Sequence, residues 1–152
     1  MEVKETVKKQ YEILKKKYDF PNLEELDREV GMLDSCEEKG IVPEYLLRYI
    51  RGNMMELFSN WLGYLHNMIM PNQQSFIHMK EYEFFDESDR EKVMLLINRV
   101  MHLNRASLSI EIERNDEKDA QFIKEAFKEF KDIKKEIMYF TQKASEKWKE
   151  TY

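Results

Sequence analysis

Apolar residues recur every three or four positions along most of the chain, which is the spacing of one face of an α-helix. The first eighteen residues show this pattern with lysines on the outer side, and Pro21 ends the predicted helix. Asn22 and Glu25 have the spacing of a capping box, so a short second helix is expected up to Gly31. The acidic stretch 33–42 is predicted to be a loop.

The same periodicity predicts a long central helix. Pro43 suits the first turn, where its missing N–H would have no partner, and the pattern then continues to Met70 before Pro71 stops it. At 1.5 Å per residue this helix would be about 42 Å long. The connection 71–87 is rich in aromatic residues and leaves room for one short helix.

Two further long helices are predicted in the second half of the chain. Ser88 and Glu91 form another capping box, which opens a helix that lasts to about Glu113. Asn115, or the aspartate that follows it, then caps a final helix that ends near Trp148. A heptad of apolar positions runs along this last helix: Ile123, Ala126, Phe130, Ile133, Ile137, Phe140 and Ala144.

These elements predict an all-α protein, a helical bundle of three long helices with an N-terminal helical arm. Only four glycines and three prolines are present, which is too few for the many turns of a β-fold. The length suits a single domain, 1–152, with the arm at 1–31 and the bundle core at 43–150. The single cysteine cannot form an internal disulfide and no export leader opens the sequence, so a cytoplasmic location is expected.

The central helix contains an uncharged stretch, 57–70, although 36% of the chain is charged. One broad side of the helix is apolar and is expected to face the core. Arg48, Arg51 and Glu56 leave too short an apolar run for the ~20 residues that span a bilayer, so no membrane helix is predicted. The expected core positions are Leu47, Ile50, Met54, Leu57, Phe58, Trp61, Leu65 and Met68.

The opposite side of this helix shows small and neutral residues, where an exposed helix in so charged a protein should show Lys and Glu. Such residues let another backbone come close, and neutral amides can pair there without the desolvation cost of a charge. Two interpretations stay open: the rest of the chain covers this face, or the face contacts a second subunit in a homodimer. The candidate interface residues are Gly52, Asn53, Ser59, Asn60, Gly63 and Asn67.

A potential anion-binding surface lies on the helix that begins near Ser88. Arg99, His102 and Arg105 stand three positions apart and form one slanting ribbon, which could bind a phosphate or carboxylate. Together with the lysine-rich first helix, the ribbon could also bind nucleic acid, although the net charge of −5 and the lack of a recognised reading motif argue against it. The alternative is a solvent face paired with acids of the final helix, such as Glu125 or Glu129.

Two polar residues of the same helix, Asn104 and Ser107, fall inside its apolar arc. An unpaired polar group is costly to bury, so we expect both to have partners and to set the register with another helix. A ligand cavity lined by them is the alternative. The apolar arc itself comprises Val93, Leu96, Ile97, Val100, Leu103, Leu108 and Ile110.

The sequence shows no catalytic, cofactor-binding or metal-binding motif. His66, His78 and His102 lie on different segments and form neither a Glu-x-x-His nor a His-x-x-x-His pair. The pattern therefore favours a non-enzymatic role in protein–protein interaction or assembly, with a second copy of the chain as the expected partner and another protein as a further one. Binding of an anion or a nucleic acid through the basic ribbon is the alternative.

Overall fold

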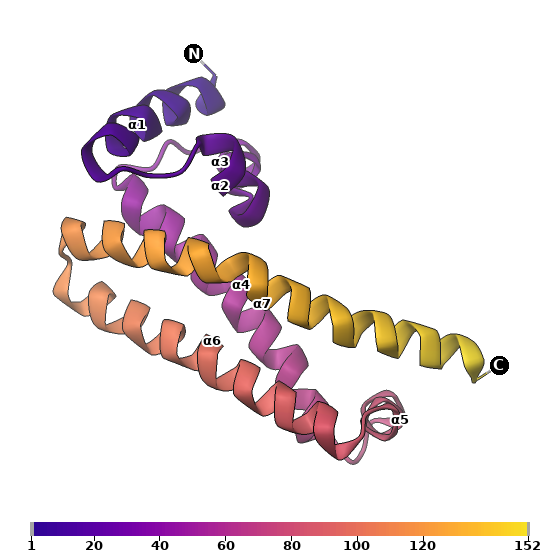
Figure 1. Cartoon of the computed structure of the whole chain (residues 1–152). Coiled ribbons are helices and arrows are strands. Elements are labelled where there is room, and N and C mark those ends of the chain that lie inside the picture. Colours follow the sequence, from indigo (N-terminus) through magenta and orange to yellow (C-terminus); the bar gives the residue numbers. More distant parts are fainter. Residues whose placement is uncertain (1, 152) are drawn as a thin grey trace. The chain divides into compact units, whose positions relative to one another are not determined.

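The computed structural model describes residues 2–151, and within this range it contains seven α-helices and no strand (Figure 1). The prediction of an all-α protein is confirmed, and the three long helices are α4, α6 and α7. The helices are α1 (Val3–Tyr18), α2 (Leu23–Val30), α3 (Met32–Lys39), α4 (Leu46–Ile69), α5 (Phe76–Phe84), α6 (Glu87–Glu113) and α7 (Asp116–Glu150).

The chain divides into two compact units. The first comprises Met1–Leu57 and Arg105–Phe130, and the second comprises Phe58–Asn104 and Lys131–Tyr152. Each of the three long helices contributes one part of its length to each unit. The residues predicted as an N-terminal arm belong to the first unit.

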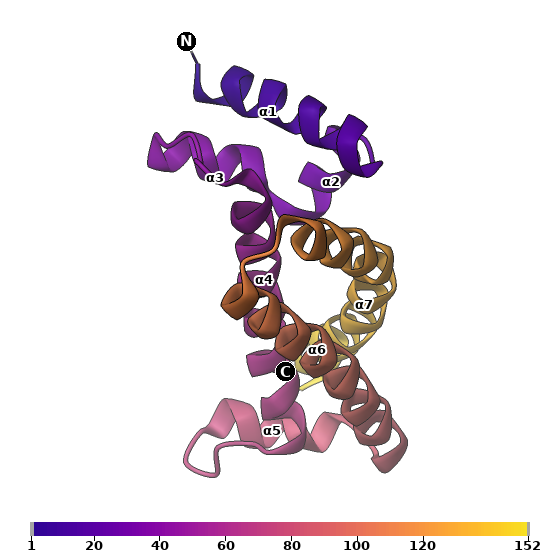
Figure 2. The same ribbon diagram turned by 90° about the vertical axis from the view of Figure 1, so that its left-hand side faces the viewer.

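The N-terminal helices of the first unit pack around Tyr11. Its side chain is fully buried, its hydroxyl donates to the carbonyl of Pro21 at 2.6 Å, and its ring stacks on Phe20 with centroids 5.9 Å apart. α1 lies beside α3 (Figure 2), where the ammonium of Lys4 is 3.1 Å from the carboxylate of Asp34. The predicted amphipathic first helix is therefore held by its apolar face against the rest of this unit.

The prediction of a loop over residues 33–42 is wrong, because most of them form α3. Glycines in the left-handed region flank this helix, with φ of 69° at Gly31 and 64° at Gly40. The carboxylate of Asp27 accepts the N–H of Leu33 at 2.7 Å. The acidic composition concealed an amphipathic pattern, because α3 buries one face through Met32, Leu33 and Cys36.

Both predicted capping boxes are replaced by other contacts. Asn22 makes no cap hydrogen bond, and its side-chain oxygen accepts instead from the Lys15 ammonium at 2.7 Å. α6 begins before Ser88, and its cap is formed by Asp86, whose carboxylate accepts the N–H of Asp89 at 2.8 Å. The Asp89 carboxylate accepts the N–H of Asp86 at 3.3 Å, so the two aspartates form the reciprocal pair two positions earlier than predicted.

The sequence also predicted how α7 and α4 begin. Asn115 caps α7, because its side-chain oxygen accepts the N–H of Lys118 at 3.1 Å. This prediction is confirmed. α4 begins at Leu46, so Pro43 precedes the helix and does not occupy its first turn. The connection before α6 contains one short helix, α5, as the sequence indicated.

The predicted apolar sides largely form the cores of the two units. All seven heptad positions of α7 are buried, and so are six of the eight core positions predicted on α4, while Leu57 and Trp61 are half-buried. On α6, Leu108 is 51% exposed and does not belong to the core, contrary to the prediction. Burial of these side chains is the main favourable contribution to folding, at about 25 cal/mol per Å² of apolar surface.

The second unit has an ion pair and an aromatic cluster near the ends of its helices. The Lys143 ammonium of α7 binds the carboxylate of Asp89, which is only 4% exposed. This contact raises the pKa of Lys143 through its hydrogen bond to Asp89. The ring of Trp148 meets Phe84 edge-on, with centroids 5.2 Å apart. Together these contacts join the C-terminal part of α7 to the start of α6 and to α5.

Over the described residues, no helix combines the length and the apolar character needed to cross a membrane. The uncharged stretch of α4 raised the question of a membrane span, and the charged residues Arg48, Arg51 and Glu56 lie within this helix.

The α6 cap provides a test of this fold. We expect Asp86→Ala to lower the free energy of unfolding by about 1 kcal/mol, because the N–H of Asp89 loses its acceptor. Urea unfolding followed by circular dichroism measures the change. Ser88→Ala is the matched control and should leave stability within about 0.5 kcal/mol, since an exposed substitution away from a cap has little effect. A larger loss for Ser88→Ala than for Asp86→Ala would contradict the assignment of the cap.

Candidate functional site

The predicted interface face of α4 is open in the structure. Gly52, Ser59, Asn60 and Gly63 are exposed, and the two remaining predicted positions, Asn53 and Asn67, are half-buried. A Cβ atom added at Gly52 or at Gly63 would meet no described atom beyond the neighbouring backbone within 4 Å. The chain itself therefore leaves the two glycines uncovered, and contact with a second subunit stays a prediction.

The same face includes three residues that the sequence analysis did not assign to it. Glu56, His66 and Met70 continue the spacing of four and three positions that joins Gly52, Ser59 and Gly63. All three are exposed. The N–H of Met70 donates to the carbonyl of His66 at 2.8 Å, so helical geometry continues as far as Met70. We call these six exposed positions, 52, 56, 59, 63, 66 and 70, the α4 stripe.

The side chains of Glu56 and His66 have no hydrogen bond or ion pair within the part of the chain that the structure describes. Exposed acids and bases on a helix commonly pair with a residue three or four positions away. Here those neighbouring positions on the stripe are glycine, serine or methionine. Helical periodicity could have found both residues, but the sequence analysis considered only small and neutral side chains.

The basic ribbon of α6 is partly neutralised. The Arg99 guanidinium donates to the Glu136 carboxylate of α7 at 3.1 Å, within the second unit. The prediction of pairing with the final helix is met at Arg99, but the partner is Glu136 and not Glu125 or Glu129. His102 and Arg105 are exposed. Anion binding by these three residues stays a prediction, because Arg99 already has a carboxylate partner.

The first unit contains a buried ionic cluster that the sequence analysis missed. Arg51 of α4 is 3% exposed, and its Nε donates to the carboxylate of Asp119 on α7 at 2.6 Å. A second guanidinium nitrogen donates to the Ser107 hydroxyl of α6 at 2.8 Å and to its carbonyl at 3.2 Å. The third nitrogen binds the carboxylate of Glu111. One guanidinium thus joins three helices of this unit.

The charged groups of this cluster stabilise one another in their ionised forms. Burial by itself lowers the pKa of the Arg51 guanidinium, but the bonds to Glu111 and Asp119 outweigh that effect and raise the pKa above its usual value. The hydrogen bond and the charge of Arg51 lower the pKa of Glu111. Ser107 is 1% exposed and has the polar partner that was expected for it. The second oxygen of Asp119 has no partner among the described residues.

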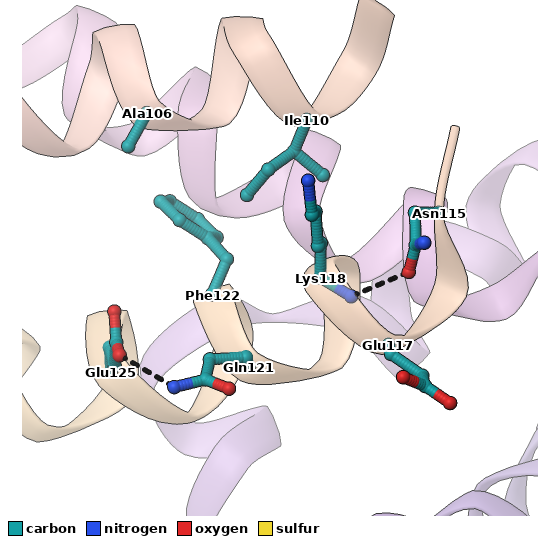
Figure 3. Close-up of a pocket in the computed structure, with 8 residues that line it drawn as sticks. All are labelled: Ala106, Ile110, Asn115, Glu117, Lys118, Gln121, Phe122 and Glu125. Atoms are coloured by element: carbon teal, nitrogen blue, oxygen red, sulfur yellow. Dashed lines mark hydrogen bonds between the residues drawn. The ribbon is translucent and has the colours of Figure 1, made fainter. Parts of the chain in front are cut away.

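A pocket of about 330 Å³ lies at the junction of α6 and α7 in the first unit (Figure 3). Phe122 points toward Ala106 and gives the pocket an apolar wall. Its polar groups make local hydrogen bonds, since the Asn115 side chain accepts the backbone N–H of Lys118 at 3.1 Å and Gln121 donates to Glu125 at 3.0 Å. These contacts cap and brace the start of α7, and they leave the pocket without an arrangement of acid, base and nucleophile.

Other kinds of site were also compared with the structure. Within residues 2–151, no group of three or more His, Cys, Asp or Glu side chains is placed to hold a metal ion. Cys36 is buried, and desolvation raises the pKa of its thiol.

The chain matches no protein-family model, no curated protein and no solved structure. Its function must therefore be argued from its surfaces alone.

The buried cluster gives a stability prediction. We expect Asp119→Ala to lower the free energy of unfolding by about 3–5 kcal/mol, because Arg51 would keep its charge in a buried position without its buried carboxylate partner. Urea unfolding measures the loss. Asp116→Ala is the control: its carboxylate is 4.0 Å from Arg48 and exposed, so its removal should change stability by less than about 1 kcal/mol.

A double replacement separates charge from packing. Arg51→Met combined with Asp119→Leu removes both buried charges and restores apolar volume, so it should be less destabilising than Asp119→Ala alone. A double variant that unfolds as easily as Asp119→Ala would show that lost packing, and not an unpaired charge, determines the effect.

Proposed function

We propose that the protein functions in assembly, by self-association through the exposed side of α4 that includes the α4 stripe. The observation that carries this proposal is the exposure of Gly52 and Gly63 in the interior of a 24-residue helix. Glycine in an exposed helix interior is about 1 kcal/mol less favourable than alanine. No described part of the chain packs closely enough on these positions to require glycine. A second helix packed closely against this face would require residues without a side chain there.

Several properties of this face support a protein partner. Small residues let two helix backbones approach to the shorter end of the usual 8–10 Å range. The asparagines on its flank can each donate and accept hydrogen bonds, so they can be satisfied by another protein surface. A second copy of the chain is the first partner to consider, because symmetric dimers are the commonest assemblies. We also propose a cytoplasmic location, on the ground that the single cysteine gives no disulfide framework.

Gly63→Leu tests the proposal. We expect the wild-type chain to form a dimer and Gly63→Leu to shift it to the monomer, because a large side chain would separate the two backbones. Size-exclusion chromatography with multi-angle light scattering measures the mass. A Cβ atom added at Gly63 meets no described atom beyond the neighbouring backbone within 4 Å, so we expect the variant to fold, and circular dichroism should show unchanged helix content. Gly63→Lys is a second variant that adds bulk without adding an apolar surface.

The matched control is Ser145→Leu, which adds a similar apolar side chain at an exposed position of α7. This variant should retain the dimer. A wild-type chain that stays monomeric at high concentration, or a dimer that both Gly63 variants leave unchanged, would refute self-association through this face.

Binding of an anion or nucleic acid is the alternative function, and it makes a separate prediction. Under this alternative, replacing Arg99 and Arg105 together by alanine should abolish salt-sensitive binding to a labelled single-stranded oligonucleotide, measured by fluorescence anisotropy. The exposed Arg99–Glu136 pair contributes at most about 1 kcal/mol, so the variant should still fold. Replacing exposed Lys128 and Lys135 of α7 is the control with the same change in charge. Unchanged binding in the arginine variant would exclude the ribbon.

A further inference from the structure

The α4 stripe reads the same in both directions. Its positions are separated by four, three, four, three and four residues, and this order is unchanged when the helix is reversed. Two copies of α4 can therefore lie antiparallel so that each stripe position faces a stripe position of the partner. The two-fold axis then passes at the level of residue 61. At 1.5 Å per residue, the stripe is about 27 Å long. Its alignment along one side of α4 follows from the helical repeat alone.

The sizes of the facing residues are complementary in this register. Ser59 faces the partner's Gly63 at the centre, and the same contact is repeated on the other side of the axis. Towards each end of the stripe, Met70 faces the partner's Gly52. Met70 is 65% exposed in the single chain, so an antiparallel partner would place a large apolar side chain over a position that has no side chain.

The charges are complementary as well. Between these contacts, Glu56 faces the partner's His66, and His66 faces the partner's Glu56. An imidazole N–H can donate to a carboxylate, and both side chains are exposed and have no hydrogen-bond or ion-pair partner among residues 2–151. The register therefore supplies a contact to each of the two polar side chains on the stripe that the single chain leaves in solvent.

The flanks of the stripe also match themselves. In a two-fold antiparallel pair, each flank of one helix meets the same flank of the other. On one flank, Asn60 meets the partner's Asn60, and Asn53 meets the partner's Asn67. Paired amides can donate and accept at the same time. This arrangement gives a physical reason for the spacing of seven residues between these asparagines.

The other flank is apolar. Met55, Leu62 and Ile69 also stand seven residues apart, and all three are half-buried in the single chain. In the antiparallel register, Leu62 meets the partner's Leu62, and Met55 meets the partner's Ile69. Burial of the remaining exposed surface of these side chains would contribute hydrophobic free energy that the small residues of the stripe cannot provide.

A parallel pair of α4 helices lacks this complementarity. Each residue would face its own copy, so Glu56 would lie against a second Glu56 with repulsion between like charges. Gly52 and Gly63 would each face a glycine and leave a gap, while the bulky Met70 side chains would meet each other. Charge and size thus both select the antiparallel arrangement.

We infer that the partner of the α4 face is a second copy of this chain bound antiparallel, with Glu56 of each copy contacting His66 of the other. This inference rests on the proposed self-association and specifies its geometry. The occupant is a second copy because the face is complementary to itself in charge, in size and along both flanks.

Single cysteines test the register in a Cys36→Ala background. Ser59→Cys and Gly63→Cys, oxidised separately, should each give no covalent dimer, because the two copies of one position are offset by about 6 Å along the helix axis. An equimolar mixture of the two should give a disulfide-linked dimer on a non-reducing gel. A covalent dimer from Ser59→Cys alone would indicate a parallel arrangement and overturn the inference.

Charge reversal provides an independent test. We expect Glu56→Lys to raise the dimer Kd roughly tenfold, since a lysine would face the partner's His66, and His66→Glu to do the same by opposing Glu56. The double variant should return the Kd to within about threefold of wild type. The two positions are about 15 Å apart on one helix, so such coupling can arise only between chains. Additive losses in the double variant would overturn the inference.

Failure of the inference and failure of the proposed function are distinguishable. A wild-type chain that is monomeric by light scattering refutes both. A dimer that Gly63→Lys dissociates, but in which the mixed cysteine variants do not cross-link, leaves self-association standing and removes the antiparallel register.

Discussion

The buried charge of Arg51 is the constraint on which the arrangement of the first unit depends. A guanidinium that is 3% exposed must be neutralised, and it receives Asp119 from α7 together with Ser107 and Glu111 from α6. Apolar contacts alone are tolerant of small shifts between helices. The directional bonds of Arg51 tolerate such shifts poorly, so this cluster sets the register of α6 and α7 against α4 in that unit.

The second unit also contains a buried charge that is neutralised by a residue of another helix. The carboxylate of Asp89 is almost completely buried, and it is balanced by the ammonium of Lys143 and by the backbone N–H of Asp86. The same residue therefore caps α6 and binds α7. In both units a charged group from one long helix is satisfied by another, while apolar heptad positions provide most of the stabilising burial.

α4 differs from its neighbours because one side contributes to the cores and the other carries two exposed glycines and the exposed Asn60. On an isolated surface helix, alanine, lysine or glutamate would be more favourable at these positions. The residues present are those that a close contact between two helices requires. The antiparallel register that we propose would account for the small residues, for the asparagine spacing and for Glu56 and His66, whose side chains have no polar partner among the described residues.

The sequence alone determined the elements of this protein, because helical periodicity is local and is read directly from the spacing of apolar residues. It correctly predicted the long helices, the buried faces of α4 and α7 and the Asn115 cap. Where several residues compete for one local role, it failed: Asp86 and not Ser88 caps α6, and the acidic stretch after Gly31 forms α3. Such outcomes depend on energies that differ by about 1 kcal/mol.

Only the tertiary structure decided which charges are buried. Arg51 and Asp119 are separated by 68 positions, and nothing in their local sequence distinguishes them from the half-buried Arg48 and the exposed Asp116. Their pairing depends on which helix faces meet, a property of the folded chain. For the same reason, the sequence indicated the unusual composition of the outer side of α4, but only the structure established that the chain leaves its glycines uncovered.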